Sequence, residues 1–161
     1  MNQNFLALGL DEVIVQAVDQ LGFEKPSPVQ EKCIPIVLNE DTDLVALAQT
    51  GTGKTASFGL PLIQKIDNDN RKTQALVLAP TRELCIQITA DLKDFAFFKK
   101  TNVVAVYGGA SITDQAKKLK KGAQVVVATP GRLQDMINRR LVDLSHIDYL
   151  VLDEADEMLN M

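Results

Sequence analysis

The apolar positions near the start of the chain recur at helical spacing. They predict one helix over residues 11–21, ended by Gly22, and a second helix that begins after Ser27. Ser27 is a favourable N-cap, and Gln30 follows three residues later, which is the spacing of a capping box. The sequence therefore predicts two helices before the first expected strand.

Beyond residue 40, short apolar runs alternate with amphipathic segments. The runs predict five strands, at residues 44–48, 75–79, 103–106, 125–128 and 149–152. The segments between them predict helices to about residue 66 and over residues 81–98, 111–120 and 131–139. Because the strands are apolar throughout, we expect them to be buried on both faces. The pattern predicts an α/β fold with a mostly parallel sheet and helices on both faces.

Composition excludes several classes of protein. No apolar run approaches the length that would span a membrane, and the N-terminus lacks the pattern of a secretory signal. Cys33 and Cys85 lie too far apart to form a metal-binding pair and are expected to be ordinary thiols in a reducing cytoplasm. A disulfide scaffold, a zinc module and a membrane protein are excluded.

The net charge of −4 hides an uneven distribution of charge. Residues 71–140 hold 13 of the 17 basic residues but only 5 of the 21 acidic ones. This balance indicates a surface that faces a polyanion, and the alternative is a solvated surface that happens to be rich in lysine.

Residues 48–55 read AQTGTGKT, between an expected strand and an expected helix. This pattern is typical of a phosphate-binding loop, with Ala48 in place of the usual first glycine. Gly51 and Gly53 would let backbone N–H groups surround phosphates at the helix N-terminus. Lys54 is the candidate contact to the β- and γ-phosphates, and Thr55 is a candidate Mg²⁺ ligand. The expected ATP site also includes the other loop residues, Gln49, Thr50 and Thr52.

Two acidic residues follow the last expected strand. Asp153 is a candidate Mg²⁺ ligand, partly through water, and Glu154 is the candidate group that activates the attacking water. The alternative is that these residues cap a short helix through Met158 and Leu159.

Six motifs in this order make the sequence resemble the DEAD-box RNA helicases over its whole length, with a narrower likeness to bacterial helicases of the cold-shock and ribosome-assembly type. The motifs are residues 22–30 (GFEKPSPVQ, the Q motif), 48–55, 80–84 (PTREL) with Gln87, 108–109 (GG), 129–132 (TPGR) and 153–156 (DEAD). The resemblance implies a RecA-like nucleotide-binding fold. It also implies that Ala48 in the phosphate loop is typical of the family.

On the ATP side, the resemblance implies that Gln30 reads adenine and that Lys25 lies beside the base. Phe23 or Phe5 would pack on the adenine ring, and which of the two does so is left open. Asp156 would couple the site to other motifs. The implied catalytic residues are Lys54, Asp153 and Glu154, with ATP and Mg²⁺ as cofactors.

On the RNA side, the resemblance implies contacts to the sugar–phosphate backbone that do not depend on base sequence. The implied contact residues are Pro80, Thr81, Arg82, Glu83, Gln87, Gly108, Gly109, Thr129, Pro130, Gly131 and Arg132. An alternative role for the two arginines is a structural ion pair, for example with Glu83 or Asp135.

The resemblance divides the chain into a Q-motif region (residues 1–39), packed on a partial RecA-like domain (residues 40–161). We expect the second RecA-like domain of the family to be missing from these residues, and the first to be incomplete at its C-terminus. A strand is therefore expected to be missing from the sheet, which would expose apolar residues of 44–48 and 149–152. The chain is expected to be the N-terminal part of a monomeric, cytoplasmic, ATP-dependent RNA helicase. The alternative is that the isolated chain binds nucleotide or RNA without unwinding.

Overall fold

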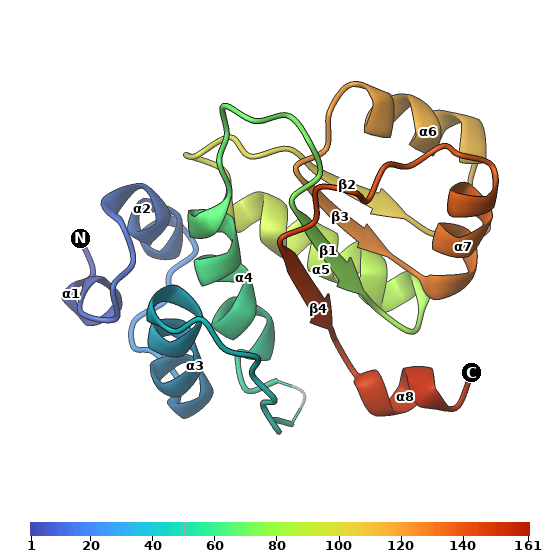
Figure 1. Cartoon of the computed structure of the whole chain (residues 1–161). Coiled ribbons are helices and arrows are strands. Elements are labelled where there is room, and N and C mark those ends of the chain that lie inside the picture. Colours follow the sequence, from blue (N-terminus) through green and yellow to red (C-terminus); the bar gives the residue numbers. More distant parts are fainter. Residues whose placement is uncertain (50) are drawn as a thin grey trace. The chain divides into compact units, whose positions relative to one another are not determined.

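A computed structural model describes residues 1–49 and 51–161 (Figure 1). The chain divides into two compact units, and each is described by itself. The first comprises Met1–Lys65 and Asp91–Lys100, and the second comprises Ile66–Ala90 and Thr101–Met161.

The first unit is helical. Its helices are α1 (Gln3–Leu6), α2 (Glu12–Gln20), α3 (Pro28–Asn39), α4 (Lys54–Lys65) and the end of α5 (Arg82–Phe95). Helix α3 packs against α4, and their apolar faces bury Ile34, Leu60 and Ile63 completely. Gly59 allows α5 to approach α4, because a Cβ there would lie 2.7 Å from the Leu92 side chain.

Local capping explains how two of these helices begin. The predicted capping box is confirmed, since the Ser27 hydroxyl accepts from the Gln30 amide (3.4 Å) and the Gln30 side-chain oxygen accepts from the Ser27 amide (3.0 Å). The short helix α1 was not predicted. Its N-cap is Asn2, whose side-chain oxygen accepts from the amides of Asn4 and Phe5.

The second unit contains a four-stranded, all-parallel sheet, which confirms the α/β prediction. The strands are β1 (Ala75–Leu78), β2 (Val103–Val106), β3 (Val125–Ala128) and β4 (Tyr149–Leu152), in the order β2-β3-β1-β4. Helices α6 (Ile112–Lys120), α7 (Pro130–Asn138) and α8 (Ala155–Leu159) complete this unit, together with the start of α5.

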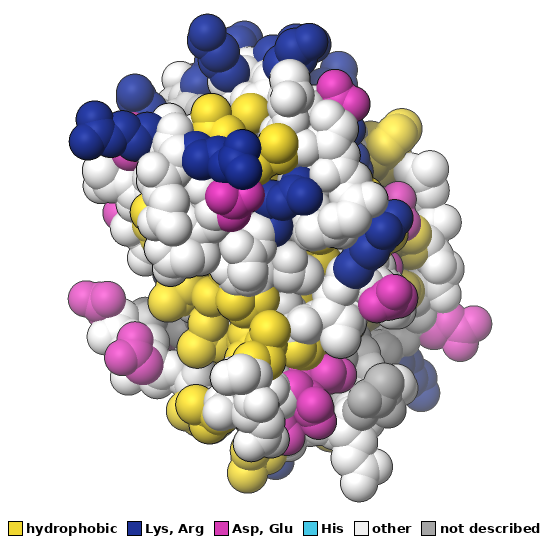
Figure 2. All heavy atoms as spheres, turned by 90° about the vertical axis from the view of Figure 1, so that its right-hand side faces the viewer, with side chains coloured by type: hydrophobic (Ala, Val, Ile, Leu, Met, Phe, Trp, Pro, Cys, Tyr) yellow, Lys and Arg dark blue, Asp and Glu magenta, His cyan; other side chains and the backbone are white. Residues whose placement is uncertain are grey.

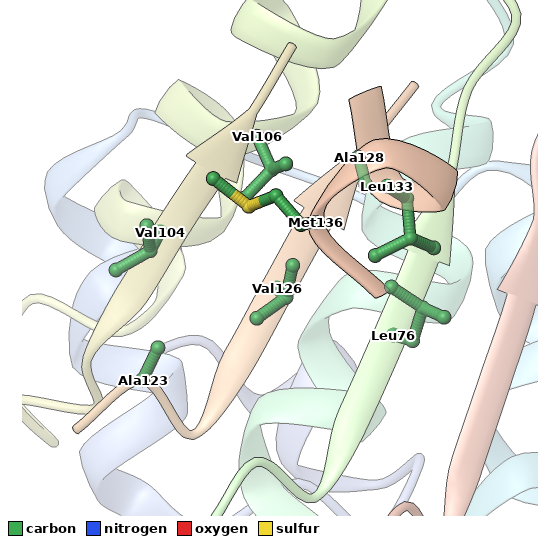
Figure 3. Packing of buried hydrophobic residues seen from close by; sticks show 8 residues of the cluster. All are labelled: Leu76, Val104, Val106, Ala123, Val126, Ala128, Leu133 and Met136. Carbon is green, nitrogen blue, oxygen red and sulfur yellow. The ribbon is translucent and has the colours of Figure 1, made fainter. Parts of the chain in front are cut away.

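The core of the second unit lies on both faces of this sheet. On one face, Met136 and Leu133 of α7 pack over the strands, with Leu133 facing Leu76 (Figure 3). On the other face, the Cys85 thiol of α5 donates to the carbonyl oxygen of Val127 (3.3 Å). Burial on both faces explains why β1, β2 and β3 carry no polar alternation.

The prediction of a strand at residues 44–48 is wrong. This segment has no regular secondary structure, and the side chains of Val45 and Leu47 are 86% and 96% exposed. A strand requires a neighbour to satisfy its backbone groups, and none of the four described strands pairs with this segment.

Strand β4 lies at one edge of the sheet. It pairs only with β1 among the described strands, and Leu150 and Leu152 are 59% and 51% exposed. The expected exposure of apolar residues in 44–48 and 149–152 is thus confirmed.

Candidate nucleotide and RNA site

The ends of the four strands bring the predicted site segments of the second unit to one edge of the sheet. In the parallel register, Leu78 is paired with both Ala128 and Leu152, and Ala128 is paired with Val106. The segments that follow these residues carry PTREL, TPGR, the acidic pair and the double glycine. Sequence spacing alone did not show that the four strands end in register.

The double-glycine loop, residues 107–110, approaches the side chain of Arg82. The guanidinium carbon lies 5.2 Å from the centroid of the Tyr107 ring, which is a cation–π geometry. Gly109 has φ +83°, and a Cβ there would lie 2.8 Å from Nη1 of Arg82. The positive φ favours glycine at 109, whereas the close approach by itself does not require it, because the exposed Arg82 side chain can move.

Arg132 holds the far end of the same loop. Its Nη1 and Nη2 both donate to the carbonyl oxygen of Ala110 (3.1 Å each), and Nη1 also donates to Oε1 of Gln115 (2.9 Å). Nε2 of Gln115 donates to the carbonyl oxygen of Tyr107 (3.0 Å). Gln115 and Tyr107 were not identified from the sequence, because these partners lie 8 to 22 positions apart.

The ion-pair alternative for the two arginines is wrong. Asp135 instead binds Arg139, one turn further along α7 (2.9 Å). Neither Arg82 nor Arg132 forms an ion pair within residues 1–49 and 51–161.

The other predicted RNA residues lie beside these arginines in the chain. The Thr81 hydroxyl accepts from the Leu84 amide (3.2 Å), which caps α5. Thr129 is the N-cap of α7, and Pro130 occupies its first turn. The exposed members of the set are Thr81, Arg82, Glu83, Gln87, Gly108, Gly109 and Gly131, and the partly buried ones are Pro80, Thr129, Pro130 and Arg132.

The basic residues of the middle of the chain gather on the surface. Figure 2 shows Lys and Arg side chains concentrated at the top of the view, which is the height at which α6 lies in Figure 1. Helix α6 carries Lys117, Lys118 and Lys120 in its last turn, followed by Lys121, and all four are exposed. The charge asymmetry of the sequence is thus a feature of the folded surface.

The acidic pair follows β4 directly. The Asp153 side chain is buried and accepts from the Glu154 amide (3.1 Å). Glu154 is at the N-cap position of α8 with φ 50°, a left-handed conformation that is costly for a residue other than glycine. Its side chain makes no cap hydrogen bond, so the helix-capping alternative lacks support for Glu154. Asp156 is exposed in the first turn of α8.

The phosphate loop belongs to the first unit and leads into α4 at Lys54. Gly51 and Gly53 both have positive φ, of +84° and +79°. The Thr52 hydroxyl donates to the carbonyl oxygen of Gln49 (2.6 Å). Within the predicted loop, Ala48 and Thr55 are partly buried, while Thr50 lies outside the described residues.

Gln30 joins the Q motif to this loop. Its Nε2 donates to the carbonyl oxygen of Gly53 (3.1 Å), while its Oε1 accepts from the Ser27 amide. A side chain at 53 would collide with the Gln30 amide. A carboxamide has two N–H groups and two oxygen lone pairs, so each end of Gln30 retains capacity for a further hydrogen bond.

The two candidate adenine-stacking rings differ in exposure. Phe5 is completely buried, whereas Phe23 is partly exposed, and their ring centroids are 6.2 Å apart. The Asn2 side chain donates to the carbonyl oxygens of Phe23 (3.1 Å) and Glu24 (2.8 Å), and Lys25 is exposed. Asn2 therefore supports the Q motif, a role that sequence reasoning missed although Asn is a common N-cap.

No cluster of three or more His, Cys, Asp or Glu side chains that could hold a metal occurs among the described residues. The predicted Mg²⁺ ligands, Thr55 and Asp153, belong to different units. Their hydroxyl and carboxylate oxygens are donors of the kind that Mg²⁺ prefers, so the donor chemistry fits this ion.

Both cysteines are free and buried. Burial raises the pKa of the Cys85 thiol to about 11, and it also raises the pKa of Cys33. We expect neither thiol to react with Ellman's reagent at neutral pH until guanidinium unfolds the protein, because the thiolate is the reactive form. Rapid labelling of Cys85 in the native protein would contradict this expectation.

None of the helices in the described part of the chain is long and apolar enough to cross a membrane.

Comparisons with known proteins agree with this geometry. Residues 27–161 match the family model described as DEAD/DEAH box helicase. The chain is 56% identical over 157 residues to the ATP-dependent RNA helicase CshA of Listeria monocytogenes, covering 98% of this chain and 30% of that relative. The chain thus spans about a quarter to a third of the length of the curated relatives it matches.

Two solved structures are similar to the chain. A DEAD box protein from the hyperthermophile Methanococcus jannaschii has a TM-score of 0.93 and 46% identity, covering 98% of this chain and 43% of that one. The RNA helicase Prp28 from Chaetomium thermophilum, bound to ADP, has a TM-score of 0.88 and 43% identity, covering 98% and 40%. This chain belongs to the DEAD/DEAH box helicase family.

Proposed function

We propose that this chain is the N-terminal, nucleotide- and RNA-binding part of an ATP-dependent RNA helicase, and that it couples ATP hydrolysis to local unwinding. The observation that carries the proposal is the common edge of the sheet. There, the double-glycine, TPGR and PTREL segments follow strands that end in register with the strand before Asp153 and Glu154. Relatives named ATP-dependent RNA helicases support it.

In this proposal, ATP binds to the phosphate loop, residues 48–55, and to the Q motif. Lys54 contacts the β- and γ-phosphates, and the α4 N-terminus adds partial positive charge. Phe23 stacks on the adenine ring, with Phe5 supporting it from the core, because only Phe23 has an exposed surface. Lys25 lies beside the base.

Gln30 reads the adenine edge with the hydrogen-bonding capacity left after its bonds to Ser27 and Gly53. Thr55 and, partly through water, Asp153 are the residues that would hold Mg²⁺, which would supply charge neutralisation at the phosphates. Glu154 accepts the proton of the attacking water, and Asp156 couples the site to other motifs.

RNA binds along the carboxyl edge of the sheet through its phosphates and riboses. The exposed backbone of Gly108, Gly109 and Gly131 permits close approach of the RNA strand. The positive charge of the two arginines complements the negative charge of the RNA phosphates. Such contacts carry no base-sequence specificity.

The proposal extends to the whole protein. We infer that the chain works as a cytoplasmic monomer within a longer polypeptide, whose second RecA-like domain completes the ATP and RNA sites. We expect little ATP hydrolysis by the 161 residues alone, because Leu150 and Leu152 are exposed and segment 44–48 pairs with none of the described strands. In isolation they would bind nucleotide or RNA weakly without unwinding.

The decisive experiment compares ATP hydrolysis by the longer protein and by residues 1–161, each with and without single-stranded RNA. We expect RNA to stimulate turnover in the longer protein only. Robust RNA-dependent turnover by residues 1–161 would contradict the need for a second domain. A longer protein that binds no RNA, or whose turnover does not respond to RNA, would contradict the helicase assignment.

A further inference from the structure

The two arginines at the RNA edge use their guanidinium groups differently. Arg132 has three hydrogen bonds within the protein, two to the carbonyl oxygen of Ala110 and one to Gln115. Arg82 is exposed, lies over the Tyr107 ring and donates no hydrogen bond to the described residues. The donors of Arg82 are available to an anion, whereas most of those of Arg132 are engaged.

Gln115 completes the connection between Arg132 and the loop. It is buried on the sheet side of α6, and its two amide atoms bridge Arg132 to the carbonyl oxygen of Tyr107. The loop from Tyr107 to Ala110 is thus held at both ends through one arginine and one glutamine. Losing either side chain would leave partly buried polar groups without their partners, which favours rearrangement of the loop.

The stretch between these two clamps is exposed. Gly108 and Gly109 are both exposed, and within residues 1–49 and 51–161 their amides donate no backbone hydrogen bond. Two free amides beside the unpaired guanidinium of Arg82 provide donors for a phosphate.

We propose that Arg132 and Gln115 are positioning residues that hold the double-glycine loop, so that Arg132 acts on RNA binding through the loop and not as a phosphate contact. The inference rests on the proposed RNA binding and assigns separate roles within it. Arg132 influences RNA through the loop, so the shape of the Arg132 side chain should matter more for RNA binding than its charge. For Arg82, the charge of the side chain should matter more than its shape.

The test measures binding of a fluorescently labelled oligouridylate to the longer protein at several salt concentrations. Replacing Arg82 with Gln should lower the slope of log K against log salt by about 0.7, the value for one lost phosphate contact on single-stranded RNA, and Arg82→Lys should restore it. Arg132→Lys and Gln115→Met should each weaken binding about tenfold with an unchanged slope. Arg139→Lys, in the same helix as Arg132 but paired with Asp135, is the matched control and should bind normally.

Limited proteolysis without RNA separates this inference from the proposed function. Chymotrypsin cleavage after the partly buried Tyr107, followed by mass spectrometry, should be faster in Arg132→Lys and Gln115→Met than in wild type, and at the wild-type rate in Arg139→Lys. Unchanged cleavage after Tyr107 in both clamp variants, or normal RNA affinity in Arg132→Lys, would overturn the inference. If the wild-type protein binds no RNA, the proposed function fails, while the cleavage rates still decide whether the clamp exists.

Discussion

Replacing Glu154 with Gln in the longer protein is expected to slow RNA-stimulated ATP hydrolysis by roughly 10²- to 10⁴-fold, the usual contribution of a positioned general base. The carboxamide has nearly the same shape as the carboxylate but cannot accept a proton from water. ATP affinity should remain close to wild type, because the contacts proposed for the base and the phosphates come from residues 22–30 and 48–55. Steady-state turnover and titration with a fluorescent ATP analogue measure the two quantities.

The control for this variant is Glu157→Gln, which changes the same charge in the first turn of α8, three residues further along. It should hydrolyse ATP normally. Turnover at the wild-type rate in Glu154→Gln would reject the role of Glu154. Loss of ATP binding in that variant would instead indicate a structural role for Glu154, linked to its left-handed backbone conformation.

Replacing Phe5 with Ala should destabilise the first unit by about 3–5 kcal/mol, the usual cost of truncating a fully buried phenylalanine. The Phe5 ring is completely buried against Phe23, and the surrounding helices would be left with a cavity. This loss is a large fraction of the stability of a typical domain, about 5–15 kcal/mol. Hydrogen exchange measures this loss of stability: the amides in α1, α2 and α4 of the longer protein should exchange faster, because this unit opens more often.

Phe23→Ala is the matched comparison, because Phe23 is aromatic, adjacent and partly exposed. It should lower stability less than Phe5→Ala and weaken ATP binding more, as expected for the ring that stacks on adenine. A Phe5→Ala variant with normal amide protection and weakened ATP binding would show that Phe5 is the stacking ring.

Secondary structure was predictable where local signals sufficed. The strands at 103–106, 125–128 and 149–152 begin and end where their apolar runs do, and the capping box at Ser27 forms as expected. The segment at 44–48 has an equally apolar sequence but forms no strand. Its state depends on whether a neighbouring strand pairs with it, which local hydrophobicity does not report.

The candidate site was partly predictable for the same reason. Motif spacing located Gly109, Arg82 and Arg132 in the segments that follow strands, but it did not show what the arginine side chains contact. The clamp residue Gln115 lies 17 positions from Arg132, in a different helix, and nothing in its immediate sequence context distinguishes it. Phe5 and Phe23 were equivalent candidates until burial separated them.

The sequence by itself therefore determined the fold class, the family and the segments that carry the site, because these depend on periodicity, on glycine and proline placement and on motif order. The tertiary structure decided which apolar run becomes a strand, which phenylalanine is buried and which arginine keeps its donors free. These properties depend on partners that are remote in sequence and meet only when the strands end in register and the helices pack, so no local pattern can specify them.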